Sequence, residues 1–540
     1  MKTRTMFTIA VVGMFCVSMS LCFLVDETVS GASVTADWKK NFGGSSTDEF
    51  LDVVTTNDGG FVAVGYSTSS SFNTMDWIGT SGKGNDDAII VKYDRNGIVE
   101  WKKNFGGSGV DRFNAVTITI DGGFVAVGYS LADSFGNGDW FGISGKGYCD
   151  AIIVKFNAAG DVEWKKNFGG SGNDSYSDVV ATSDGGFVAV GTSDWDSFGN
   201  GDWVGTTAPD RFNKLGEAII VKHESSGSVQ WKKNIGGDGD DKFTSVTVTH
   251  DGGFVAVGES WNSIGTGDWI DLIGSTFAGT IVEYDKNGNV LWKNGGQTST
   301  YIAVTTTNNG FVAVGLSIVE YDKNGGVSWQ RNLSNIRLFD VAYDGQNIIV
   351  AGYSYVGTSD VSDALIACYD ESGYALWDVG FGGNYADHLY GLSITSDGLI
   401  VVGYSWPQAF GTGDWIGVTG KGGIDATLAK YLNEYEVTFN PNNGTFSNTI
   451  SVIFGSVLTP PIEPSFTSKE FVGWFTDDGV EWNFSNNKVT NDLTLTAKWI
   501  DIQTGSDENV TDDNSDYLLY GIVGVVAILM LAGIVFFVRK

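Results

Sequence analysis

The sequence is short of the residues from which enzymes most often build catalytic and metal sites. It contains three histidines and four cysteines in 540 residues, and no HExxH, GxSxG or Cys/His pattern with metal-ligand spacing is present. The histidines, His223, His250 and His388, are far apart in the chain. Nothing singles out a carboxylate pair for glycoside hydrolysis among the 64 acidic residues. We therefore predict no catalytic residues, no metal, no cofactor and no enzymatic activity.

Positive charge and proline are also scarce. The formal net charge is −32, and the 32 Lys and Arg residues form no basic patch along the sequence. Because phosphate binding is driven by Lys and Arg that release counterions, this balance excludes nucleic acid as a partner and favours a solvated extracellular surface. Only 6 Pro accompany 75 Gly, 33 Phe, 20 Tyr and 18 Trp. This composition is typical of many short strands joined by tight turns.

The N-terminal end has the pattern of a secretory leader. Basic residues precede an apolar run from Met6 to Val25, and small residues follow it. The pattern predicts a signal peptide over residues 1–36, cleaved after Ala32 or Ala36. The alternative is an uncleaved membrane anchor, because the apolar run is long for a signal peptide.

The C-terminal end predicts attachment to a membrane. Residues 517–538 are apolar throughout and long enough to span a bilayer as one helix. The basic pair at 539–540 places that end in the cytoplasm. Residues 501–516 include six acidic residues and no aromatic residue, which indicates a disordered linker. The body of the protein is therefore expected on the extracellular side.

Between the two ends, one module recurs. Its characteristic strand first appears as WKKNFGG at Trp38–Gly44, and the fullest copy runs from Trp101 to Glu163. A fixed period of this kind marks a repeat architecture. Within a module we place a strand after the Gly-Gly pair, an FVAVG strand, an AIIVKY strand and the tryptophan strand, joined by glycine-containing turns. The tryptophan strand occurs seven times, at Trp38, Trp101, Trp164, Trp231, Trp292, Trp329 and Trp377.

The ends of the repeat predict a closed ring. The chain enters with a lone tryptophan strand and leaves with a third strand, Ala426–Tyr431, that has no fourth strand of its own. Pairing these two ends would complete one sheet and remove exposed edges. We therefore predict an all-β fold, a seven-bladed β-propeller over residues 37–433 closed by the N-terminal strand. Cys149 and Cys368 fall in modules that are not neighbours in such a ring, so we expect buried thiols and no disulfide.

The module resembles the SBBP-type β-propeller repeat. Asp87–Tyr93, DAIIVKY, and Asp150–Phe156, DAIIVKF, carry the resemblance, which covers about residues 37–433. The fifth module lacks this aspartate, and Glu217 and Ala278-Gly279 occupy its region in the third and fourth modules. The resemblance implies the fold and a surface location, and it brings no catalytic residues.

The composition changes after Leu432, where the module stops. The following segment resembles a Listeria–Bacteroides (internalin B-repeat) module, which implies a small β-grasp-like spacer over residues 435–500. The matching positions are Thr438-Phe439, Asn443-Gly444, Pro461, Pro464, Gly473-Trp474-Phe475, Trp482, Phe484 and Leu493–Trp499.

Long loops between the second and third strands of a module are expected on one face of the ring, where function should be sought. Five of them contain an Asp-Trp pair: Asp76-Trp77, Asp139-Trp140, Asp202-Trp203, Asp268-Trp269 and Asp414-Trp415. Our hypothesis is that each tryptophan is a platform for a sugar ring, with the carboxylate as a hydrogen-bond acceptor. The alternative is that each tryptophan folds its own loop onto the blade while the aspartate caps a turn.

Two other features of these loops are weaker. Asp133, Asn137 and Asp139 are oxygen ligands that calcium would accept, but the spacing of a calcium loop is absent. Lys83, Lys146 and Lys421 lie in Gly-Lys-Gly tripeptides without the spacing of a phosphate-binding loop. We interpret the lysine segments as flexible loops.

The sequence therefore predicts a membrane-anchored cell-surface protein whose propeller is a binding or adhesion module. The expected partners are an extracellular glycan or protein ligand and the membrane, through the C-terminal helix, with the body outside the cell and the C-terminus in the cytoplasm. The alternatives are a carbohydrate-active enzyme with its site at the channel mouth and a purely structural envelope protein.

Overall fold

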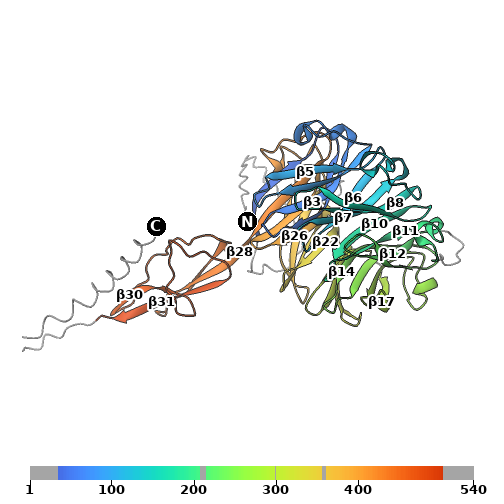
Figure 1. Ribbon diagram of the computed structural model, residues 1–540. Helices are drawn as coiled ribbons and strands as arrows, with labels where there is room; N and C mark the ends of the chain where they lie inside the picture. Colours follow the sequence, from blue (N-terminus) through green and yellow to red (C-terminus); the bar gives the residue numbers. More distant parts are fainter. Residues whose placement is uncertain (1–33, 207–214, 298–299, 356–360, 503–540) are drawn as a thin grey trace, which may run out of the picture. The chain divides into compact units, whose positions relative to one another are not determined.

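The computed structural model describes residues 34–206, 215–297, 300–355 and 361–502 (Figure 1). Most of the expected signal peptide and linker, and all of the expected transmembrane helix, lie outside these ranges. Within the described part of the chain, the regular structure consists of 31 strands and eight three-residue 3-10 helices. No helix in that part is long and apolar enough to cross a membrane. The all-β class is therefore confirmed.

Six sheets, here called blades 1 to 6, each contain four consecutive antiparallel strands. Blade 1 is β2 (Asp48–Thr55), β3 (Phe61–Thr68), β4 (Asp86–Tyr93) and β5 (Val99–Phe105), and blade 2 is β6 (Asp111–Ile118), β7 (Phe124–Leu131), β8 (Cys149–Phe156) and β9 (Val162–Phe168). Blade 3 is β10 (Asp174–Ala181), β11 (Phe187–Ser193), β12 (Glu217–His223) and β13 (Val229–Ile235), and blade 4 is β14 (Asp240–Val248), β15 (Phe254–Trp261), β16 (Phe277–Tyr284) and β17 (Val290–Gln297). Blade 5 is β18 (Tyr301–Thr306), β19 (Gly310–Gly315), β20 (Ser317–Asp322) and β21 (Val327–Asn332), and blade 6 is β22 (Ile336–Tyr343), β23 (Asn347–Tyr355), β24 (Ser362–Asp370) and β25 (Ala375–Phe381).

The seventh sheet, here called the closing sheet, has seven strands in the order β26-β27-β28-β31-β30, with β1 and β29 also paired to β28. Its strands are β1 (Val34–Phe42), β26 (Asp387–Thr395), β27 (Gly398–Ser405), β28 (Asp425–Asn440), β29 (Asn448–Ile453), β30 (Lys469–Phe475) and β31 (Leu493–Asp501). The expectation of seven four-stranded blades is therefore corrected to six. The physical reason is that β28 continues past the repeat without a break, so its sheet extends into the C-terminal segment.

The N-terminal strand closes the repeat as expected. Strand β1 pairs antiparallel with β28, from Val34 opposite Asn433 to Phe42 opposite Ala426. The strand begins at Val34, so cleavage after Ala36 would remove three residues that are paired in the sheet. In Figure 1 the blue strands of blade 1 and the orange strands of the closing sheet lie side by side.

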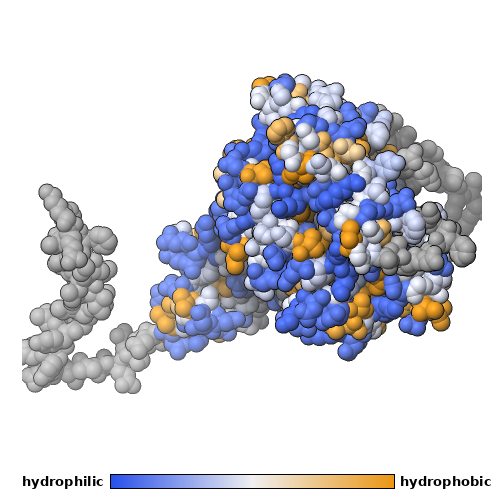
Figure 2. Space-filling model, turned by 45° about the vertical axis from the view of Figure 1, so that its right-hand side comes forward, coloured by the Kyte–Doolittle hydropathy of each residue, from blue (hydrophilic) through white to orange (hydrophobic). Residues whose placement is uncertain are grey.

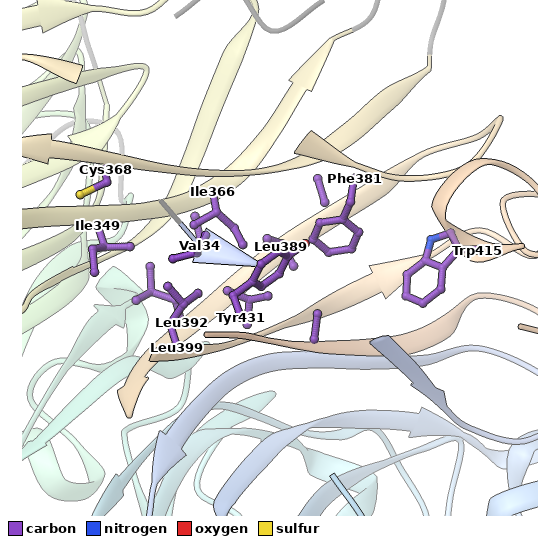
Figure 3. Close-up of a cluster of buried hydrophobic side chains, with 14 of the residues drawn as sticks. Val34, Ile349, Ile366, Cys368, Phe381, Leu389, Leu392, Leu399, Trp415 and Tyr431 are labelled. Atoms are coloured by element: carbon purple, nitrogen blue, oxygen red, sulfur yellow. The ribbon is translucent and has the colours of Figure 1, made fainter. Parts of the chain in front are cut away.

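The middle strands are apolar along most of their length because both faces of each sheet are covered. In β3 the first seven residues are buried, and in β4 the last seven are buried. Seven hydrophobic clusters fill the spaces between successive sheets. Figure 3 shows one of them, in which Ile366 of blade 6 packs near Leu389 and Tyr431 of the closing sheet. Burial of this apolar surface is the main stabilising term of the fold.

At six junctions between sheets, the repeated tryptophan contacts the following sheet. Its ring lies against the hairpin glycine of the following blade, where a Cβ atom would come within 3 Å of the indole. These glycines have φ between 66° and 80°, a conformation that favours glycine. The pairs are Trp38 and Gly97, Trp101 and Gly160, Trp164 and Gly227, Trp231 and Gly288, Trp292 and Gly325, and Trp329 and Gly373.

The chain divides into two compact units. Among the described residues, the second unit contains 439–447, 461–482 and 495–502. Its small core is aromatic, with Trp474 5.1 Å from Phe439 and 5.7 Å from Phe471, between ring centres. The propeller and everything described below belong to the first unit.

Candidate functional site on the long-loop face

The end of the sheets that carries the loops between the second and third strands is here called the long-loop face, and the opposite end the hairpin face. The Asp-Trp pairs form short 3-10 turns in these loops: η2 (Met75–Trp77), η4 (Gly138–Trp140), η6 (Gly201–Trp203), η7 (Gly267–Trp269) and η8 (Gly413–Trp415). Three loops have a further turn before the pair: η1 (Ser69–Ser71), η3 (Ala132–Ser134) and η5 (Trp195–Ser197).

The five tryptophans of the Asp-Trp pairs are fully buried. The exposed fraction is 0% for Trp77, Trp140, Trp203, Trp269 and Trp415. An indole without solvent exposure cannot stack on a sugar ring, so the platform hypothesis is wrong for these residues. The alternative describes them: each tryptophan folds its own loop onto the blade.

A buried aspartate lies at the start of the first strand of each of these sheets. In four of the five it accepts the indole N–H of the tryptophan, and in blade 3 Trp203 donates to the Ser193 hydroxyl at 3.1 Å. In blade 1 the indole Nε1 of Trp77 donates to Oδ1 of Asp48 at 3.0 Å. Asp48 also accepts hydrogen bonds from the hydroxyls of Ser67 and Ser71 and from the Gly44 N–H. The aspartate therefore accepts hydrogen bonds from four donors that the folded loop removes from water. Buried donors need such partners. The corresponding aspartates are Asp111, Asp174, Asp241 and Asp387.

The sequence carries a signal for this cluster that the site prediction did not include. An aspartate follows the second glycine of the Gly-Gly pair by four residues, as in Gly44 to Asp48, in the same five modules that have an Asp-Trp loop. The fifth and sixth modules lack both the aspartate and the loop. The two features therefore belong to one structural unit.

Burial raises the pKa of these aspartates because it disfavours the charged carboxylate. For Asp174 and Asp387 the pKa is about 6, although hydrogen bonds from serine, tryptophan and backbone donors oppose the shift. The pKa values of Asp48, Asp111 and Asp241 are raised for the same reason.

The aspartates of the Asp-Trp pairs connect neighbouring blades. Oδ2 of Asp139 in blade 2 accepts from the Gly106 N–H at 2.9 Å and from Nζ of Lys83 in blade 1 at 2.5 Å. Asp202 of blade 3 is bound in the same way by Gly169 and by Lys146 of blade 2, at 2.9 and 2.6 Å. The interpretation of the Gly-Lys-Gly segments as flexible loops is therefore wrong, because their lysines form ion pairs between blades.

Asp87, the aspartate of the DAIIVKY strand, holds the Gly-Lys-Gly segment around Lys83 in place. Oδ1 of Asp87 accepts from the Gly84 N–H, and Oδ2 accepts from the Lys83 N–H and the Asn104 amide, at 2.5 to 2.9 Å. Asp150 forms the same three bonds in blade 2. The repeated carboxylates of the loops are thus engaged in structural contacts.

Each of these loops exposes the residue immediately after its buried tryptophan. This residue is always apolar, and between 67% and 80% of its surface is accessible: Ile78, Phe141, Val204, Ile270 and Ile416. Figure 2 shows one side of the protein, on which hydrophobic residues lie singly or in small groups among hydrophilic ones. A single exposed apolar side chain is ordinary, but its recurrence at one position of five anchored loops is a property of the repeat.

The loops of blades 2 and 3 also border a groove of about 850 Å³. Tyr148, Trp195 and Asn200 contribute side chains to its lining, together with Ser171 and Asp196. The Asn200 amide donates to the Ser171 hydroxyl at 3.2 Å and to the Asp196 carbonyl at 2.8 Å. The groove therefore combines aromatic rings with a hydrogen-bonded polar wall.

The innermost strands surround a small cavity of about 190 Å³, to which Asp52, Asp178 and Asp340 contribute. Each carboxylate accepts a backbone N–H from another sheet, donated by Val116, Val246 and Leu392 respectively, at 2.7 to 2.8 Å. Burial raises the pKa of all three, to about 7 for Asp340. Their geometry is that of bridges between sheets.

The histidines and cysteines occupy structural positions. His388 stacks on Tyr353 with ring centres 3.9 Å apart and hydrogen-bonds to Ser362 and Tyr404. Burial lowers the pKa of His388 to about 4, so its ring is neutral near pH 7. Cys149 and Cys368 are free, buried thiols. Across the ranges that the structure describes, no group of three or more His, Cys, Asp or Glu residues could hold a metal ion.

Comparison with known proteins supports the reading of the C-terminal segment. The family model of the Listeria-Bacteroides repeat domain matches residues 435–498. This confirms the resemblance inferred from the sequence over residues 435–500.

Two relatives come from Evansella cellulosilytica. One, whose name describes it as a Gly-rich membrane protein, is 26% identical over 188 residues, which cover 29% of this chain and 22% of the relative. Another, named as a membrane protein, is 33% identical over 70 residues, which cover 13% of this chain and 10% of the relative. The chain thus spans less than a quarter of either relative.

Solved structures resemble the chain only loosely. Sqt1 from Chaetomium thermophilum is 11% identical, with a TM-score of 0.37 over 74% of this chain and 99% of that one. The Pan2 WD40 domain of Neurospora crassa is 10% identical, with a TM-score of 0.34 over 54% of this chain and 75% of that one. Likeness at this level carries no argument about function.

Proposed function

We propose that this protein is a cell-surface binding or adhesion protein whose long-loop face contacts an extracellular ligand. The observation that carries the proposal is the set of five apolar side chains, Ile78, Phe141, Val204, Ile270 and Ile416, each exposed beside a buried tryptophan. The fold leaves an apolar residue exposed to water at the same position of five loops. The structure of the loop itself does not explain why this position is apolar. Contact with a partner would bury it.

The loops are built to hold these side chains in fixed positions. In blade 2, Phe141 follows Trp140, whose indole donates to Asp111 at 3.0 Å, while the adjacent Asp139 is held by Lys83. A surface that is rigid before binding loses less conformational entropy when it meets its partner. The arrangement therefore suits recognition.

We further propose that part of the closing sheet acts as a seventh blade of an SBBP-type propeller. Strands β26, β27, β28 and β1 pair in the order of the four strands of a blade. The Leu392 N–H donates to Asp340 of blade 6, and the Thr55 N–H of blade 1 donates to Ser393. The central cavity also receives residues from β26 as well as from the inner strands of all six blades. These contacts support a ring completed by the closing sheet.

The proposed location is the outer face of a cell membrane, with the signal peptide removed and a single helix over residues 517–538 as the anchor. The apolar C-terminal sequence and the names of the relatives support it. Protease added to intact cells is expected to remove the propeller and leave a membrane-bound C-terminal fragment. Full protection of the propeller in intact cells would contradict this orientation.

The proposed function does not include catalysis or nucleic-acid binding. The repeated carboxylates and the three cavity aspartates are bound to structural donors, which supports a role in binding over the carbohydrate-active enzyme considered above. The net charge of −32 supports the exclusion of nucleic acid.

The binding function can be tested with a five-site variant in which Ile78, Phe141, Val204, Ile270 and Ile416 are replaced by serine. The full chain in lipid nanodiscs is expected to bind isolated cell envelopes of the producing organism, and the variant should bind at least tenfold less. The matched control replaces Ile98, Ile120 and Tyr374 by serine, because these residues are 60%, 92% and 67% exposed in turns of the hairpin face. Equal binding by the variant and the control would refute the assignment of the long-loop face.

A further inference from the structure

We propose that the groove between the long loops of blades 2 and 3 binds a neutral oligosaccharide, with Tyr148 and Trp195 as the aromatic surfaces that contact the sugar rings. This inference deepens the proposed binding function and rests on it, since it assigns one ligand class to one place on the long-loop face.

The two aromatic residues of this groove stand at positions where other copies of the repeat have small or polar residues. At the position of Tyr148, the loop of blade 1 has Asn85 and the loop of the closing sheet has Gly423. At the position of Trp195, blade 1 has Ser69 and blade 2 has Ala132. The same loop architecture therefore forms without these rings. Their presence on two successive loops that border one groove is not explained by folding.

Tyr148 is held by its backbone while its ring faces solvent. Its N–H donates to the Gly172 carbonyl at 3.1 Å, and its carbonyl accepts from the Ala132 N–H at 3.0 Å. The side chain is nevertheless 75% exposed. A large ring fixed at the rim of a groove contributes contact area at low entropic cost on binding.

Trp195 comes from the loop of blade 3 and also lines the groove. It begins the turn η5, and its carbonyl accepts from the Phe198 N–H at 3.3 Å. Phe198 itself is 9% exposed and packs on the buried Trp203, with ring centres 4.8 Å apart. The half-buried Trp195 thus sits on a loop that the repeat's own core holds in place.

The polar wall fits hydroxyl groups. The Ser171 hydroxyl donates to the Asp196 carbonyl at 2.7 Å, and the Asn200 amide bonds both Ser171 and Asp196. The carboxylate of Asp196 is exposed at the groove and can accept hydrogen bonds from a ligand. Aromatic faces next to acceptors and an amide match a pyranose, which presents C–H groups on its faces and hydroxyls at its edges.

Charge restricts the ligand to neutral sugars. The lining contains Asp196 but no Lys or Arg, and the chain carries a net charge of −32. An acidic sugar would meet repulsion without a counter-charge in the groove. The volume of about 850 Å³ lies in the upper part of the range for small-molecule sites, which favours an oligosaccharide over a single sugar.

The test is isothermal titration calorimetry of the full chain in detergent with five neutral probes: maltohexaose, cellohexaose, chitohexaose, xylohexaose and mannohexaose. At least one probe is expected to bind. Two variants replace the aromatic residues by those that other copies of the repeat already tolerate, Tyr148→Asn and Trp195→Ala. Each is expected to weaken binding at least tenfold with an unchanged melting temperature. Tyr374→Asn, on the hairpin face, should bind like the parent.

The outcomes separate this inference from the function on which it rests. Binding that neither variant weakens overturns the groove as the site, and no binding to any of the five probes overturns the neutral-glycan class. In both cases, loss of envelope binding in the five-site serine variant would still support the long-loop face as the contact surface. Retention of envelope binding in that variant would refute the proposed surface independently of the sugar result.

Discussion

Lys421, in the loop that precedes β28, forms an ion pair with Asp76, in the loop of blade 1. Its ammonium also donates to the Asn41 carbonyl of β1 at 2.6 Å. Residues 345 positions apart in sequence are thereby joined at the place where the N-terminal strand pairs with β28. The contact repeats the bridges from Lys83 to Asp139 and from Lys146 to Asp202. Ring closure therefore uses the same lysine-to-aspartate contact as the junctions between consecutive blades.

The first prediction concerns this closing contact. Lys421→Met is expected to lower stability by about 1–3 kcal/mol, because it removes charge-assisted hydrogen bonds at a partly buried junction and leaves Asp76 with one donor fewer. The melting temperature of the full chain would report the loss. Lys103→Met is the control, since Lys103 pairs with Asp161 at 3.1 Å where both side chains are largely exposed. Such surface pairs contribute little, and equal losses in the two variants would contradict the closing role of Lys421.

The buried aspartates should be the most sensitive residues of the long loops. Asp111→Ala would leave the Trp140 indole, two serine hydroxyls and the Gly107 N–H without their acceptor. We expect a loss of about 3–5 kcal/mol and a change in the near-UV circular dichroism of Trp140. Asp133→Ala, in the exposed part of the same loop, should change stability by less than about 0.5 kcal/mol. A tolerated Asp111→Ala substitution would show that the tryptophan, not the aspartate, organises the loop.

Stability should rise as the pH falls from neutral toward about 5. The pKa values of Asp174 and Asp387 are raised to about 6 and that of Asp340 to about 7, above the value of about 3.9 expected in the unfolded chain. The folded protein therefore binds more protons than the unfolded one between pH 4 and 7. The contribution of these groups is fully present below about pH 4 and is lost as the pH rises through 6 to 7.

Other aspartates limit the rise at still lower pH. The pKa values of Asp58, Asp121 and Asp184 are lowered to about 2, with side-chain hydrogen bonds from threonine and lysine among the causes, so their contribution declines below about pH 4. Melting temperatures between pH 3 and 8 should thus show a maximum near pH 5. Asp340→Asn should flatten the slope between pH 5 and 7.5, and Asp344→Asn, in the exposed turn between β22 and β23, should not. A parent protein most stable at pH 8 would contradict this account.

Local patterns made much of the fold predictable. The apolar strands, the glycine turns and the lone tryptophan strand at the start of the repeat led to the all-β propeller and its closure, because each is a short-range signal. The number of four-stranded blades was wrong because composition changes at Leu432 while β28 continues to Asn440. A strand that crosses a compositional boundary leaves no mark in the sequence.

The candidate site was less predictable. The sequence of an Asp-Trp pair does not show whether the indole points to water or into the blade. Its orientation depends on Asp48 and its equivalents, about 28 residues away in the chain. The bridge from Lys83 to Asp139 depends on how neighbouring blades pack, which no local pattern encodes. Tyr148 and Trp195 could have been found as departures from the repeat, but only the structure places them beside one groove.

The last prediction tests the closure directly, by comparing a chain that begins at Val34 with one that begins at Ser45. The shorter chain loses β1, and with it the cover of Trp38 over Gly97 and of Phe42 over Trp77, whose ring centres lie 5.1 Å apart. It also leaves the backbone groups of β28 unpaired along an exposed edge, which can template association between chains. We expect the shorter chain to melt at least 10 °C lower and to form oligomers detectable by light scattering.

A peptide of residues 34–44 provides the second measurement, which remains informative if the shorter chain folds poorly. Added in excess, it can pair with β28 in the register seen here, from Val34 opposite Asn433 to Phe42 opposite Ala426. Its binding should raise the melting temperature and suppress the oligomers, because a ligand that binds only the folded chain stabilises it. A peptide in which Trp38 and Phe42 are replaced by serine should fail to do so. If the shorter chain is as stable and monomeric as the longer one without any peptide, β1 does not close the ring.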